Sequence, residues 1–266
     1  MLKKIGALLV ICLVLCGAPF RTPALSSSPD ASEWVVLPDS DLPEEDHTVP
    51  ERISAREDLI NRMDRLGRRL YEKTGGKAQR AHYSEDIYIC KNFISYLFRQ
   101  YRSLYRIGAC DSVPLVIPGN LPSEDCAPYA YGIAWKSVPA EKGNPFLTAA
   151  VFLYSDSLSE KENMEQARQV MQQIQRGDVL QMSASYEYGR GAHTAFFLSD
   201  YDPETDSVSW MDSNMRGGKV DGIRYGIVQY NETREIDWWC HAFCHPGRGA
   251  TLYRLRDDLI YADSLP

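Results

Sequence analysis

The order of the hydrophobic patterns along the chain limits its fold more than any other feature. Apolar side chains recur with helical spacing over residues 50–73, where Gly75-Gly76 is expected to end the helix, and over residues 90–105. A third helix is expected over residues 157–176, with Ser159 and Glu162 at capping-box spacing. Short strand-like runs follow with turns between them; these runs cover residues 179–183, 192–199, 207–214, 223–230, 234–239 and 250–255. Strands joined by short turns pair antiparallel. The sequence therefore predicts an α+β fold, with N-terminal helices packed on a mostly antiparallel sheet.

Residues 1–24 have the composition of a secretory signal peptide. Two lysines precede an apolar run over residues 5–15, and small residues and prolines follow it. The run is short for a membrane-spanning helix. We expect cleavage after Ala24, with Ala18 as the alternative cleavage site and lipidation of Cys16 as a further alternative. The protein is then secreted or held in the cell envelope, and it meets a membrane only if the signal is retained or lipidated.

Charge and composition define the rest of the chain. Residues 25–50 are rich in Ser, Pro, Asp and Glu and are expected to form an acidic flexible linker. Residues 51–266 are long enough for one domain with a substantial core. The net charge is −7, and loss of the signal with its three cations makes it −10. An acidic protein without a dense basic patch is a poor partner for nucleic acid.

Export changes the interpretation of the cysteines, because five of the seven remain in an oxidising compartment. The expected disulfides are Cys110–Cys126 and Cys240–Cys244, since both close short loops. Two histidines accompany the second pair, so a zinc site or free thiols are alternatives there. No metal or cofactor is expected. The pairing leaves Cys90 as an unpaired thiol.

Cys90 and three later polar residues have the order of a cysteine hydrolase site. Cys90 lies in the first turn of an expected helix, where the helix dipole favours a thiolate. His193 begins a strand, and Asp212 and Asn214 share one face of the next strand, where either could accept the histidine N–H. Each residue also has an ordinary structural interpretation: a buried free thiol, a satisfied histidine, or turn residues.

Three segments carry a resemblance to a known family. Gly177-Asp178, His193-Thr-Ala-Phe-Phe and Trp210-Met-Asp-Ser-Asn214 resemble the CHAP and NlpC/P60 groups of papain-like amidases and peptidases. CHAP domains are the closer match, because Asp212-Ser-Asn214 reproduces their acid-x-Asn spacing. The resemblance implies that Cys90 is the nucleophile and His193 the base. It makes Asp212 the residue that orients His193, with Asn214 as a second polar partner or the alternative orienter.

The resemblance also implies an activity. It predicts a papain-like domain in which residues 106–176 form an insertion, and an amidase or endopeptidase that hydrolyses amide bonds in a peptide, with the peptides of peptidoglycan as substrate. Two other functions use the same scaffold. A transglutaminase-like acyl transferase would pass the acyl group to an amine, and a catalytically inactive binding module would keep Cys90 merely buried.

Overall fold

The computed structural model describes residues 53–81, 87–121, 132–135, 138–183, 192–220 and 223–264. All of them belong to one of two units of the chain, Pro50–Pro266. The predicted signal peptide and acidic linker, and Cys126 of one predicted disulfide, lie outside the described residues.

The helices match the three that the sequence predicts, with one addition. They are α1 (Ala55–Thr74), α2 (Cys90–Tyr101), α3 (Glu160–Met171) and the unexpected α4 (Ile236–Phe243). Short 3₁₀ turns cover Arg102–Leu104, Ala140–Lys142 and Ala262–Ser264. In the described part of the chain, none of the helices is both long and apolar enough to cross a membrane.

The strands form one large sheet and two small ones. The large sheet has the order β1 (Gln79–Ala81), β10 (Ile223–Glu235), β9 (Ser207–Val220), β8 (His193–Phe197), β7 (Val179–Met182), β11 (Gly249–Leu255) and β6 (Phe146–Leu153). The small sheets are β12 (Leu259–Tyr261), β2 (Tyr105–Ile107) and β3 (Cys110–Pro114), and β4 (Asn120–Leu121) with β5 (Gly132–Ile133). All neighbours pair antiparallel, which confirms the α+β prediction.

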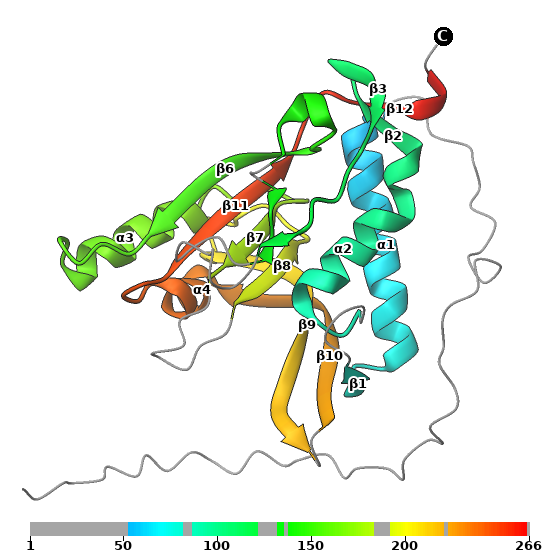
Figure 1. Cartoon of the computed structure of the whole chain (residues 1–266). Helices are drawn as coiled ribbons and strands as arrows, with labels where there is room; N and C mark the ends of the chain where they lie inside the picture. The colour runs from blue at the N-terminus through cyan, green and yellow to red at the C-terminus, as the bar shows by residue number, and fades with distance from the viewer. Residues whose placement is uncertain are drawn as a thin grey trace, which may run out of the picture. The chain divides into compact units, whose positions relative to one another are not determined.

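Helices cover both faces of the large sheet (Figure 1). α1 and α2 pack on each other and lie against β8, β9 and β10 on one face. α3 and α4 pack on each other over the opposite face, where they bury a large hydrophobic cluster. Side chains alternate along β8, so Ala195 and Phe197 enter this cluster and His193 lies on the same side. The start of β8 therefore places His193 at one end of a central strand, beside α4.

Local capping explains where two of the helices begin and end. The Ser54 side chain accepts the N–H of Glu57 at the start of α1, and Gly75 ends that helix with a left-handed φ of 59°. Ser159 and Glu162 form the predicted capping box at the start of α3. The predicted end of α1 at Gly75 and the predicted capping box of α3 are confirmed.

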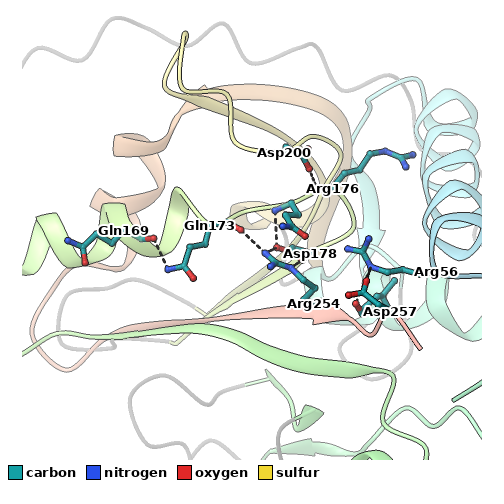
Figure 2. A network of polar contacts seen from close by, with 10 residues as sticks. Arg56, Gln169, Gln173, Arg176, Asp178, Asp200, Arg254 and Asp257 are labelled. Carbon is teal, nitrogen blue, oxygen red and sulfur yellow. Dashed lines mark hydrogen bonds and ion pairs between the residues drawn. The ribbon is translucent and has the colours of Figure 1, made fainter. Parts of the chain in front are cut away.

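The turn before β7 is fixed by a buried ion pair (Figure 2). Asp178 is fully buried and accepts the N–H of Gln175 at 2.9 Å. Arg254 of β11 donates to both Asp178 oxygens, at 2.9 and 2.7 Å, and also to the carbonyl of Gln173 at 2.6 Å. Gly177 lies in this turn and adopts a φ of 90°, a conformation that favours glycine. The Gly-Asp pair thus fixes the start of the strand beside β8.

The predicted strand over residues 234–239 is wrong in its second half. β10 continues to Glu235, and the chain then turns into α4. Ile236, Trp239 and Phe243 are spaced three and four residues apart, and all three are fully buried on one face of this helix. A helix can bury this apolar stripe against the sheet, whereas a strand would turn alternate members outward.

The predicted Cys240–Cys244 disulfide is also wrong, because both thiols are free. Cys244 caps α4 and its N–H donates to the Cys240 carbonyl at 2.8 Å. Helical residues four apart have Cβ atoms about 5–6 Å apart, whereas a disulfide needs roughly 3.8 Å. Burial raises the pKa of Cys240 to about 12 and that of Cys244 to about 11. Both are therefore protonated thiols at neutral pH.

Candidate active site

Cys90 is the first residue of α2, as predicted, and this helix start lacks a capping side chain. Its N-cap residue is Ile89, which offers no side-chain hydrogen bond, and the first turn holds no acidic residue. The free N–H groups of a first helical turn attract an anion. The N–H of Lys91 donates to the Cys90 sulfur. The helix start therefore favours a thiolate at Cys90.

His193 and Asp212 form a direct hydrogen bond. His193 Nε2 lies 2.7 Å from Asp212 Oδ2, and the two side chains are only 11% and 4% exposed. The Cys90 thiol is hydrogen-bonded to the same imidazole. Because Asp212 occupies Nε2, the remaining ring nitrogen, Nδ1, is the one available to the sulfur. The three side chains thus form a chain of hydrogen bonds from sulfur to carboxylate.

A local separation of two strands makes room for the sulfur. β8 pairs with β9 only at Phe196 and Phe197, although β9 continues far beyond them. The N–H of Leu198 donates to the Ser209 carbonyl of β9, so by alternation the N–H of Thr194 also points toward β9. That Thr194 N–H donates to Cys90 Sγ. The cysteine therefore receives a backbone hydrogen bond that the sheet leaves unused.

The electrostatics of the three groups favour an ion pair. Burial alone would raise the pKa of the Cys90 thiol, but the hydrogen bond and charge of His193, with the two backbone N–H groups, lower that pKa below its ordinary value. Burial alone would lower the pKa of His193, yet Asp212 and Cys90 raise it to about 10. At neutral pH this geometry stabilises thiolate beside imidazolium.

Three of the four predicted site residues meet in this way. Asn214 lies two residues beyond Asp212 on β9, where its register partner is Ile227 of β10. Among the described residues the His193 ring bonds Asp212 and Cys90, and no bond joins it to Asn214. The sequence leaves open whether Asp212 or Asn214 orients His193. In this geometry Asp212 is the residue that bonds the His193 ring.

Two tryptophans contact the site without having been predicted to do so. Trp210 Nε1 donates to Asp212 Oδ2 at 3.0 Å. The Trp239 ring stacks on the His193 ring, with 6.2 Å between centroids and 19° between planes. The alternation of Trp210 with Asp212 along β9 is a sequence signal for the first contact. The helical spacing of α4 is the signal for the second, because it turns Trp239 toward the sheet.

A glycine on β10 fixes the approach of the chain to Cys90. A Cβ at Gly226 would lie 2.1 Å from the carbonyl oxygen of Tyr88, two residues before Cys90. The backbone of Tyr88 cannot turn aside as a flexible side chain would. Gly226→Ala is therefore expected to displace the start of α2, to cost about 1–3 kcal/mol in unfolding free energy, and to slow alkylation of Cys90. Chemical denaturation and thiol labelling measure both effects.

Gly119→Ala is the matched control for that variant. A Cβ at Gly119 meets no atom of the described residues within 4 Å. It adds the same methyl group without forcing any neighbour to move, so stability and labelling should stay at wild-type values. Equal behaviour of the two variants would contradict the steric role of Gly226.

Neither a metal site among the described residues nor a comparison with known proteins gives further information on the function. Among the described residues, no group of three or more His, Cys, Asp or Glu side chains could hold a metal ion, so the zinc alternative at residues 240–245 is not supported. No family model matches the chain, and neither a curated protein nor a solved structure matches it. The hydrogen-bonded chain of Cys90, His193 and Asp212 is the feature of this region that bears on function.

Proposed function

We propose that the protein is an exported cysteine hydrolase that cleaves amide bonds in peptides. The observation that carries the proposal is the partly buried hydrogen-bonded chain from Cys90 through His193 to Asp212. A merely buried thiol would have a raised pKa, as Cys240 has, whereas the pKa of Cys90 is lowered. The nucleophile at a helix start and the base on an adjacent strand support a papain-like arrangement.

The reaction follows from these positions. The Cys90 thiolate attacks the carbonyl carbon, a C–S bond forms, and the carbonyl electrons move to the oxygen. The uncapped N–H groups at the start of α2, including that of Cys90, are placed to stabilise this oxyanion. The imidazolium of His193 gives its proton to the amide nitrogen as the C–N bond breaks and the amine leaves. A thioester on Cys90 remains.

Water completes the cycle. Neutral His193 takes a proton from water as the water oxygen attacks the thioester carbonyl, and the C–S bond then breaks to release the acid. Cys90 leaves as a thiolate and His193 keeps the proton, which restores the ion pair. The carboxylate of Asp212 holds the imidazole in one orientation throughout.

The resemblance to CHAP and NlpC/P60 domains selects the first substrates to test, the peptides of peptidoglycan. The mature chain is incubated with these fragments, and mass spectrometry identifies the cleaved bond. Cys90→Ala is expected to remove all cleavage while the fold, measured by circular dichroism, is kept. Cleavage that survives in Cys90→Ala would refute the proposal.

An added amine separates hydrolysis from acyl transfer in the same assay. A hydrolase releases the free acid in the presence of a competing primary amine. A transglutaminase-like enzyme would instead give the amide of the added amine as the main product. That outcome would keep the nucleophile and replace the acceptor in the second half of the reaction.

A further inference from the structure

The Asp212 carboxylate is held through one of its two oxygens. Oδ2 receives both the His193 ring at 2.7 Å and the Trp210 N–H at 3.0 Å. Oδ1 is buried and, among the described residues, bonds to no partner. With His193 as its only partner, the carboxylate could rotate about the Cβ–Cγ bond, because nothing holds the second oxygen. The Trp210 bond is a second bond to Oδ2 and restricts that rotation.

Trp210 is itself held rigidly. Its side chain is 3% exposed and belongs to the hydrophobic cluster under α4. Its ring stacks on Trp238, with 5.6 Å between centroids and 22° between planes. The edge-to-face contact with Trp239 has centroids 4.9 Å apart and an interplanar angle of 77°. Since Trp239 also stacks on His193, one aromatic cluster fixes both partners of the His193–Asp212 bond.

The other ionisable groups near this pair do not replace the Trp210 bond. On α4, Asp237 is paired with Arg168, and Cys240 is a protonated thiol. On β10, Glu232 is the register partner of Trp210. On α2, Cys90 bonds the other side of the imidazole. The N–H of Trp210 is therefore the donor that accompanies His193 at Asp212 Oδ2.

We propose that Trp210 is a positioning residue, whose N–H keeps Asp212 Oδ2 directed at His193. This inference rests on the proposed function, because it concerns how the same three groups are aligned. Trp210 transfers no proton and touches no reacting atom. Hydrogen bonds from an N–H group to a carboxylate are charge-assisted, and bonds of that kind are shorter and stronger than neutral ones.

The test removes the N–H and keeps an aromatic ring. Trp210→Phe is expected to lower kcat for the cleaved peptide about tenfold, the usual order for one lost hydrogen bond to a charged group, with little change in KM. The pH midpoint of Cys90 alkylation should also move upward, because a loosely held Asp212 stabilises the imidazolium of His193 less well.

Trp135→Phe is the matched control. Trp135 is fully buried, and its Nε1 has no hydrogen-bond partner among the described residues. Trp135→Phe thus loses the same volume from a core but breaks no bond to Asp212. It should keep the wild-type pH midpoint. If it lowers kcat and shifts the midpoint as much as Trp210→Phe, packing alone explains the effect and the inference is overturned.

A second variant tests the inference if Trp210→Phe folds poorly. Trp210→β-(3-benzothienyl)alanine replaces the indole N–H with sulfur and keeps the shape of the ring. The same loss of kcat and the same upward shift are expected, and wild-type values would overturn the inference. Failure of the proposed function looks different: the wild-type protein itself would then show the slow alkylation of an ordinary thiol.

Discussion

His193→Ala is expected to reduce turnover of an amide substrate by roughly 10⁴-fold or more. The variant loses the group that stabilises the Cys90 thiolate, the acid that protonates the leaving amine and the base that activates water. The hydrogen bond to Asp212 is lost as well, and the carboxylate is left buried without the imidazole. Steady-state kinetics on the peptide identified above measure the loss, with the melting temperature as a check on folding.

Asp212→Asn is expected to lose activity but less than His193→Ala, because replacing the carboxylate of such a triad costs less than replacing its histidine. Its amide oxygen can still accept the N–H of His193, so the ring keeps its orientation but loses the facing negative charge. Asn214→Ala is the control on the same face of β9 and should stay near the wild-type rate, because Asn214 does not bond His193. Equal losses in Asp212→Asn and His193→Ala, or a larger loss in Asn214→Ala, would show that the roles are assigned wrongly.

Local sequence patterns predicted the parts of the site that depend on one element at a time. The helical spacing after Cys90 placed that residue in a first helical turn, and α2 begins there. The alternation along residues 207–214 placed Asp212 and Trp210 on one face of β9, which the hydrogen bond between them requires. These features follow from the period of a helix or a strand, so they can be predicted without knowledge of the packing.

Features that depend on packing between elements could not be predicted in this way. The separation of β8 from β9 beyond Phe196 arises because α2 places Cys90 beside Thr194, and no local pattern marks it. The turn from β10 into α4 was missed because residues 234–239 also fit a short strand. Their continuation to Phe243 completes a helical stripe that only the facing sheet can bury.

The prediction of a Cys240–Cys244 disulfide failed because it, too, depended on the secondary structure around the two residues. A loop with three residues between two cysteines closes easily in a flexible chain, which is the assumption behind the predicted Cys240–Cys244 pair. α4 and its C-cap hold the two residues in helical spacing, and the bond cannot form there without unwinding the helix. The secondary structure has to be right before the spacing of cysteines can be interpreted.

The pH dependence of Cys90 reactivity is expected to show the ion pair. A thiol with a lowered pKa is a thiolate above that lowered value, and His193 remains an imidazolium up to a pKa of about 10. Alkylation of Cys90 should therefore stay fast well below the ordinary thiol pKa of about 8.5. In His193→Ala, the hydrogen bond and charge that lower the pKa of Cys90 are gone, whereas burial still raises it. The pKa of the Cys90 thiol should therefore rise above its ordinary value.

The most direct test of the proposed site is the rate at which iodoacetamide alkylates Cys90 as a function of pH. Peptide mass spectrometry follows this rate in the wild type and in His193→Ala. Cys240 and Cys244 are internal controls in each digest, because burial raises their pKa values and should keep their labelling slow. We predict fast labelling of Cys90 that persists below pH ~8.5 and is lost in the variant. Slow labelling that rises only near that pH and is unchanged in His193→Ala would contradict the ion pair and, with it, the proposed hydrolase.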